Sequence, residues 1–148
     1  MLDNLLTGDL IEINKSCDDW KEAIHLGCNL LINKGTIDRN YEKAIIKNII
    51  ELGAYMVIMP HVILAHSKPE EGVKQSSISF VTLEKGVNFG HEQNDPVKFV
   101  ITLASKNKEK HIQALTKLVE LFRNNEDLNG IFNAKNKNQV LDIMKKYK

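Results

Sequence analysis

The nine residues Val97–Ser105 (VKFVITLAS) constrain the fold most, because they form the most strand-like run in the chain. A second run, Ser77–Leu83 (SISFVTL), alternates and is rich in β-branched residues, which also predicts a strand. Shorter apolar stretches at Leu10–Ile13 and Tyr55–Met59 have the same character. We therefore expect a β-sheet with Val97–Ser105 at its centre.

The segments between these strands repeat apolar residues at intervals of three and four, which is typical of one face of a helix. A first helix is expected to begin near Asp18, behind a capping box of Ser16 and Asp19, and to end at Gly35. A second helix is expected within Asp38–Gly53, with a cap residue at each end.

A third helix is expected to start near Asn107 or Lys108, directly after the strongest strand. Its predicted apolar stripe consists of His111, Ile112, Leu115, Leu118, Val119 and Phe122. Two short helical segments, Leu128–Phe132 and Asn138–Tyr147, should close the chain, and Glu84–Gly86 is predicted to be a turn.

Strands that alternate with helices imply an α/β fold in which helices flank a mixed central β-sheet. The chain has 148 residues and shows no repeat, low-complexity linker or domain boundary, so we expect a single layered domain over residues 1–148. A hydrophobic fraction of 43% is enough for a core.

Charge and composition exclude several classes of protein. The formal net charge is +1, from 20 basic and 19 acidic residues, which argues against a nucleic-acid or membrane-surface partner. The two cysteines, Cys17 and Cys28, have no CxxC spacing. No signal-peptide pattern and no apolar run of membrane-spanning length is present, so we expect a cytoplasmic protein.

Histidine is the only side chain between Leu52 and Ser67 that can change its charge near neutral pH. His61 and His66 lie in the loop expected after Tyr55–Met59, and His111 lies in the first turn of the third helix. An α/β topology could bring these strand and helix ends together, since sites gather beyond the carboxyl ends of strands. The alternative for each histidine is a purely structural role.

Two chemistries fit convergent histidines. A metal site would need closely spaced carboxylate or thiolate ligands, and no such pattern occurs. The other is a histidine that accepts a phosphoryl group, for which a second histidine and a helix N-terminus would stabilise the added charge. The signatures GxxxxGK[ST], GxGxxG, HExxH and GxSxG are absent.

The chain resembles the IIA components of the bacterial phosphoenolpyruvate-dependent sugar phosphotransferase system, of the mannitol/fructose superfamily and nearest to its ascorbate-type branch. The segments that carry the resemblance are Gly53–Tyr55, Val57-Ile58, Ala65–Val73 (AHSKPEEGV), Val87–Gly90, Asn94–Val97 and His111–Leu115 (HIQAL). Together, in this order, they are a fairly specific signal that covers the whole chain.

This resemblance implies that a histidine here takes a phosphoryl group from the carrier protein HPr and passes it to a cysteine of a IIB component. His66 is the expected nucleophile because its downstream tail matches the family, although Ala65 stands where the family usually has proline. His61, which follows Pro60, competes with it. His111 matches the second histidine, which stabilises the phosphoryl group.

His61 and Lys47 are possible neighbours of this site, and neither a cofactor nor a metal is implied. Val62, Ile63 and Leu64 could form an apolar docking rim, or they could be strand core. The membrane IIC component would be reached through IIB, for uptake of ascorbate or a pentitol-like sugar. Two other functions stay open at this point: a IIA-like regulatory module and a histidine metal-binding protein.

Overall fold

A computed structural model describes residues 2–148 and contains one five-stranded mixed sheet in the order β1-β4-β5-β3-β2. Its strands are β1 Ile11–Lys15, β2 Val57–Met59, β3 Val62–Ala65, β4 Ser77–Val87 and β5 Val97–Ala104. The pairs β1–β4 and β3–β5 are parallel, whereas β4–β5 and β2–β3 are antiparallel. The predicted mixed sheet is confirmed, with β5 in its middle.

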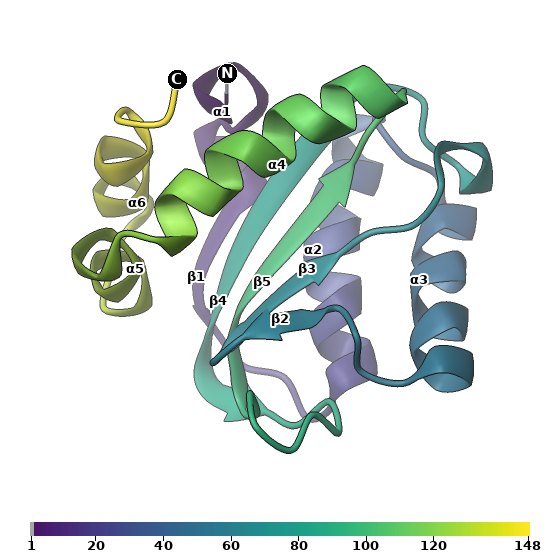
Figure 1. The fold of residues 1–148 in the computed structure, drawn as a ribbon, viewed down its shortest axis with the longest axis horizontal. Helices are drawn as coiled ribbons and strands as arrows, with labels where there is room; N and C mark the ends of the chain where they lie inside the picture. Colours follow the sequence, from purple (N-terminus) through teal and green to yellow (C-terminus); the bar gives the residue numbers. More distant parts are fainter. Residues whose placement is uncertain (1) are drawn as a thin grey trace.

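Helices cover both faces of the sheet, as an α/β fold requires (Figure 1). The helices α2 (Trp20–Lys34) and α3 (Arg39–Leu52) lie on one face, and α4 (Lys108–Phe122) crosses the other. Three shorter helices gather beside β1: α1 Leu2–Leu5, α5 Asn125–Phe132 and α6 Lys137–Met144. No helix within residues 2–148 is both long and apolar enough to cross a membrane.

The residue that caps the start of α2 is not the predicted one. Asp19, not Ser16, is the N-cap, and its side chain accepts a hydrogen bond from the Glu22 N–H at 2.9 Å. The Glu22 carboxylate accepts a hydrogen bond from the N–H of Asp18, the residue before the cap. The Ser16 hydroxyl instead donates to the Glu84 carboxylate. The predicted stop at Gly35 is confirmed by its left-handed backbone, with φ 84°.

The loop predicted after Met59 contains a strand that was not predicted, β3. The chain reverses at Pro60–His61, where His61 takes a left-handed φ of 70°, and β3 then enters the sheet between β2 and β5. The side chains of Val62, Ile63 and Leu64 are buried, so they are strand core and not a docking rim. Glu84–Gly86 is likewise not a turn, because β4 runs through it to Val87.

The buried face of α4 agrees with the predicted stripe only in part, at Leu118 and at the partly buried Leu115 and Phe122. Ala114, Leu118 and Leu121 face the core, whereas Ile112 and Val119 are 53% and 41% exposed. Two overlapping apolar faces share Leu118, and the face that includes the small Ala114 is the one packed inward. The helix therefore presents unexpected apolar side chains to solvent.

Candidate active site

The parallel pairing of β3 and β5 brings three polar side chains to one edge of the sheet. His66 follows β3 and Ser105 follows β5, so both lie beyond the same carboxyl edge. His111 lies in the N-terminal part of α4, which begins directly after β5 and is capped by Asn107. The rings of His66 and His111 have centroids 5.9 Å apart and are tilted by 38°.

A hydrogen bond to the backbone orients the His66 ring. Its Nδ1 lies 2.8 Å from the carbonyl oxygen of Leu64. A carbonyl oxygen can only accept a hydrogen bond, so Nδ1 must carry the ring hydrogen. In the neutral ring, Nε2 then holds a lone pair, which is the form that a nucleophile needs.

His111 is half-buried beside Ser105, and its Nδ1 lies 3.2 Å from the Ser105 hydroxyl oxygen. Burial lowers the pKa of His111 below its usual value, and the neighbouring His66 lowers it further. The His111 ring is therefore uncharged near neutral pH.

Tyr41, on α3, ties the end of β3 to the end of β5. Its hydroxyl oxygen accepts a hydrogen bond from the Ser67 N–H at 2.9 Å and donates to the Leu103 carbonyl at 2.7 Å. The side chain is fully buried, which raises the pKa of its hydroxyl well above the usual range. The hydroxyl therefore stays protonated and fixes the backbone next to His66. This role of Tyr41 was not predicted from the sequence.

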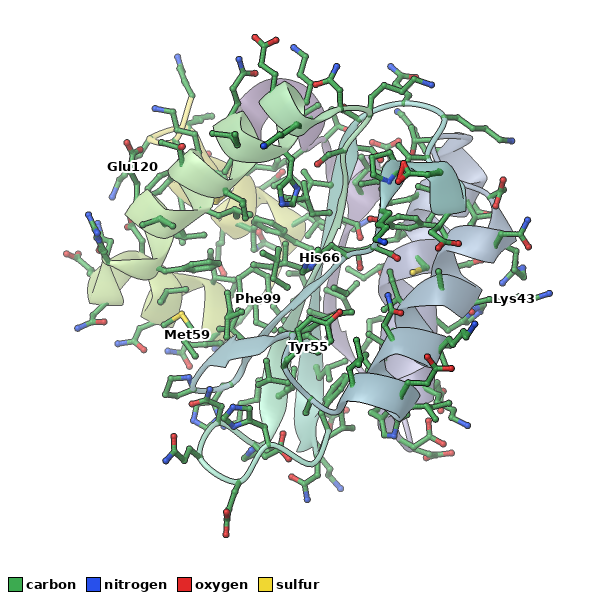
Figure 2. The ribbon with its side chains drawn as sticks, turned by 45° about the vertical axis from the view of Figure 1, so that its right-hand side comes forward. Lys43, Tyr55, Met59, His66, Phe99 and Glu120 are labelled. Atoms are coloured by element: carbon green, nitrogen blue, oxygen red, sulfur yellow. The ribbon has the colours of Figure 1, made fainter. Side chains whose placement is uncertain are left out.

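His66 and His111 open into a cavity of about 580 Å³. Its other lining residues are Asn48, Leu52, Tyr55, Ser67, Lys68, Pro69, Ser105, Asn107 and Lys108. Leu52 and Tyr55 form an exposed apolar rim, with 67% and 49% of their surfaces accessible. Tyr55 lies just below His66 in Figure 2. An unprotonated ring nitrogen thus belongs to a residue that lines an accessible depression, with lysines beside it and apolar side chains at its edge.

Comparison with known proteins agrees with this geometry. The model of the family described as "Phosphoenolpyruvate-dependent sugar phosphotransferase system, EIIA 2" matches residues 4–147. The chain belongs to this family. EIIA components are phosphotransferases that transfer phosphoryl groups through a histidine, and this EIIA chain is a phosphocarrier of a sugar phosphotransferase system.

Individual relatives cover nearly the whole EIIA chain. It is 32% identical to the ascorbate-specific PTS system EIIA component of Escherichia coli (strain K12), over 96% of this chain and 93% of that protein. The solution structure of the mannitol-specific cryptic phosphotransferase enzyme IIA, CmtB, from Escherichia coli is 32% identical, covers 98% of both chains and has a TM-score of 0.90. The crystal structure of a PTS IIA protein, PtxA, from Streptococcus mutans is 28% identical, covers 99% of this chain and 94% of that one, and has a TM-score of 0.91.

His61 and Lys47 do not line the cavity that holds His66. His61 precedes β3, and five residues of extended chain place it roughly 16 Å from His66. Its Nδ1 donates to the Pro96 carbonyl oxygen at 2.7 Å, and its ring meets that of Phe132 edge-on at 6.3 Å. The structure therefore does not place His61 among the neighbours of His66.

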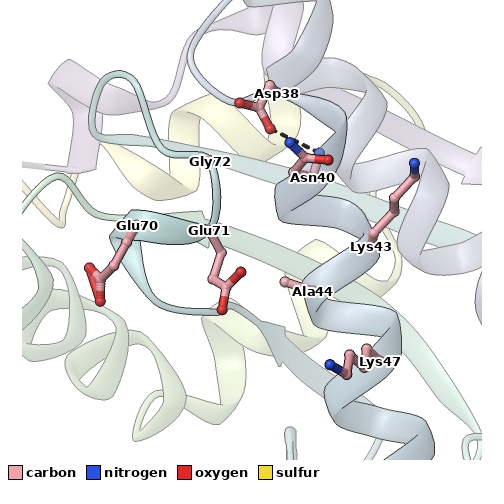
Figure 3. A pocket seen from close by; sticks show the side chains of 8 residues that line it. All are labelled: Asp38, Asn40, Lys43, Ala44, Lys47, Glu70, Glu71 and Gly72. Carbon is pink, nitrogen blue, oxygen red and sulfur yellow. Dashed lines mark hydrogen bonds between the residues drawn. The ribbon is translucent and has the colours of Figure 1, made fainter.

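Lys47 is exposed on α3 and borders a separate pocket of about 350 Å³. Figure 3 shows it across from Glu71 of the 3-10 turn η2, Pro69–Glu71. The lysines that line the same cavity as the two histidines are instead Lys68 and Lys108. Within residues 2–148, no group of three or more His, Cys, Asp or Glu side chains could hold a metal ion.

Proposed function

We propose that His66 of this EIIA chain is the phosphorylated nucleophile and that His111 stabilises the phosphoryl group. The observation that carries the proposal is the hydrogen bond from Nδ1 of His66 to the Leu64 carbonyl, which leaves Nε2 unprotonated beside His111. In the proposed step, the bond between phosphorus and a ring nitrogen of phospho-HPr breaks as phosphorus bonds to Nε2 of His66. The electron pair of the broken bond stays on the HPr nitrogen.

The phosphoryl group brings a charge of about −2 that the site must stabilise. Lys68 and Lys108 line the cavity and supply positive charge, and the N-terminal turn of α4 adds the positive end of its dipole. His111 supplies a hydrogen-bond donor. Such a transfer depends on positioning and electrostatics, so the proposed step uses neither a metal nor a cofactor.

The exposed apolar side chains around the cavity suit proteins that dock briefly. Leu52 and Tyr55 border it, and Ile112 follows His111 on the exposed face of α4. We propose that HPr and the IIB component use this surface in turn, so that the phosphoryl group moves on from His66 to a IIB cysteine. The membrane IIC component is reached through IIB, and no nucleic acid takes part.

We further propose that residues 1–148 act in the cytoplasm as one EIIA domain. Ascorbate or a pentitol-like sugar is the proposed substrate of the transport system. This proposal rests on the ascorbate-specific relative, which is 32% identical over 96% of the chain.

The test is intact mass after incubation with phosphoenolpyruvate, enzyme I and HPr. The wild type should gain one phosphoryl group, as should His61→Ala, and His66→Ala should gain none. His111→Ala should gain the group but lose it sooner. If His61→Ala alone failed to gain the phosphoryl group, the nucleophile would be His61. If the wild type gained no phosphoryl group, the carrier function would be refuted. Onward transfer to a IIB cysteine would distinguish a transport component from a regulatory module.

A further inference from the structure

Ser105 is a buried hydroxyl next to the second histidine of the site. It is 7% exposed and directly follows β5, and its Oγ lies 3.2 Å from Nδ1 of His111. A buried hydroxyl hydrogen without an acceptor costs free energy, whereas an unused lone pair costs little. Among the residues that the structure describes, Nδ1 of His111 is the acceptor that the Ser105 hydroxyl reaches. The direction that satisfies the hydroxyl within the protein is therefore donation by Ser105, with Nδ1 of His111 as the acceptor.

This direction decides where the hydrogen of His111 sits. A neutral imidazole carries one ring hydrogen, so an accepting Nδ1 places that hydrogen on Nε2. The lowered pKa of His111 agrees with a neutral ring. At His66 the arrangement is reversed, because its Nδ1 donates to the Leu64 carbonyl and its Nε2 is unprotonated.

We propose that Ser105 is a positioning residue that fixes the Nε2–H tautomer of His111, so that the site holds two histidines in opposite tautomers. This proposal rests on the proposed function, in which Nε2 of His66 receives the phosphoryl group. With the rings 5.9 Å apart, Nε2–H of His111 can donate to an oxygen of that group. An unprotonated Nε2 would instead direct a lone pair at a negatively charged oxygen.

The opposite tautomers also spare the transfer a proton movement. His66 attacks phosphorus through a nitrogen that is already unprotonated and keeps its hydrogen on Nδ1, shared with Leu64. His111 keeps its hydrogen on Nε2. Both rings are thus prepared before the donor protein arrives, which is the kind of preorganisation that lowers the cost of a polar reaction.

The first test is nitrogen-15 NMR of the imidazole rings in the unphosphorylated protein. We expect His66 to carry its hydrogen on Nδ1 and His111 to carry it on Nε2. In Ser105→Ala, the nitrogen-15 chemical shifts of His111 should move towards those of a ring that exchanges between its two tautomers. Ser105→Thr, which keeps the hydroxyl, should have the chemical shifts of the wild type. A hydrogen on Nδ1 of His111 in the wild type, or unchanged shifts in Ser105→Ala, would overturn the proposal.

A second readout is the lifetime of the phosphoryl group on His66. Ser105→Ala should shorten it several-fold. His111→Asn places its amide near the position of Nδ1 and should shorten it by roughly ten-fold, because a hydrogen bond to a charged group is lost. His111→Gln, whose amide reaches the position of Nε2, should stay closer to the wild type. Equal lifetimes in His111→Gln and His111→Asn would contradict a donor at Nε2.

Ser79→Ala is the matched control. It also removes a buried hydroxyl, which donates to the Gly27 carbonyl oxygen at a distance of 2.8 Å. Because this hydroxyl bonds to neither histidine, the substitution should change neither the nitrogen shifts nor the lifetime of the phosphoryl group. If Ser105→Ala does not fold, Ser105→Cys, with a weak donor of similar size, takes its place. If the wild type takes up no phosphoryl group, the proposed function fails, while the tautomer spectra still decide the role of Ser105.

Discussion

The two ends of β3 each carry a histidine, and their surroundings are opposite. At the start of the strand, the His61 backbone N–H donates to the Asn94 carbonyl, and the His61 carbonyl accepts from the Phe99 N–H. Its ring donates to the Pro96 carbonyl at 2.7 Å. At the end of the strand, His66 makes one local bond through Nδ1 and opens into a cavity.

The loop Phe89–Asp95, which accepts the hydrogen bond from the His61 N–H, is itself fixed by several hydrogen bonds. The Asp95 carboxylate accepts hydrogen bonds from three successive backbone N–H groups, those of Phe89, Gly90 and His91. The Asn94 side-chain amide donates to the carbonyl of Val57 on β2. We therefore expect a structural role for His61 and a chemical role for His66, whose unprotonated ring nitrogen lies at an accessible edge. The residue type alone does not separate the two.

The largest effect expected from this contrast is that two alanine variants change opposite properties, one phosphoryl uptake and the other stability. His66→Ala should abolish phosphoryl uptake and change the free energy of unfolding little. His61→Ala should keep uptake but lower the free energy of unfolding by about 1–2 kcal/mol, because the Pro96 carbonyl loses its donor. Urea unfolding and intact mass measure the two quantities. Loss of uptake in both variants would show that the two ends of β3 are not independent.

A smaller effect is expected when the end of β3 next to His66 loses its hydrogen bond to the Tyr41 hydroxyl. Tyr41→Phe leaves the Ser67 N–H and the Leu103 carbonyl without their shared partner, which should lower the free energy of unfolding by about 1–3 kcal/mol. Phosphoryl uptake should also slow, because the backbone beside His66 is no longer fixed. Tyr55→Phe is the control, since Tyr55 is exposed at the rim. A Tyr41→Phe protein with wild-type stability and uptake would refute the anchoring role.

The smallest expected effect is on the pH dependence of stability. Because burial and His66 lower the pKa of His111, the folded protein binds this proton less readily than the unfolded chain. The resulting stability is present above pH 6.5, the ordinary pKa of histidine, and is lost as the pH falls through the lower pKa of the folded state. We expect the free energy of unfolding to fall more from about pH 7 to about pH 5 in the wild type than in His111→Gln. An equal fall in both proteins would contradict the lowered pKa.

Local patterns were enough to predict the helices after Asp18 and most of the two long strands. The cap residues Asp38 and Asn107 occupy the expected helix starts, and Val97–Ala104 is the central strand. The meeting of His66 and His111 could also be expected, because each follows a strand of an α/β sheet. The helices and strands depend on residues close to one another in the chain, whereas the meeting of the two histidines follows from the general rule that sites gather beyond the carboxyl ends of strands.

Features that depend on distant partners could not be predicted in the same way. The strand Val62–Ala65 is a short apolar run, and only its neighbours β2 and β5 decide that it is a strand. The hydroxyl of Tyr41 meets partners 26 and 62 residues along the chain, Ser67 and Leu103. The buried face of α4 was predicted only in part, because two apolar faces overlap and packing against the sheet selects between them.

The most direct test of the central claim is phosphorus-31 and nitrogen-15 NMR of the phosphorylated protein. The claim is that His66 accepts the phosphoryl group through Nε2, since its Nδ1 is bonded to the Leu64 carbonyl. We expect phosphorus bonded to Nε2 of His66, with the hydrogen still on Nδ1. Phosphorus on Nδ1 of His66, or on His61 or His111, would contradict the claim.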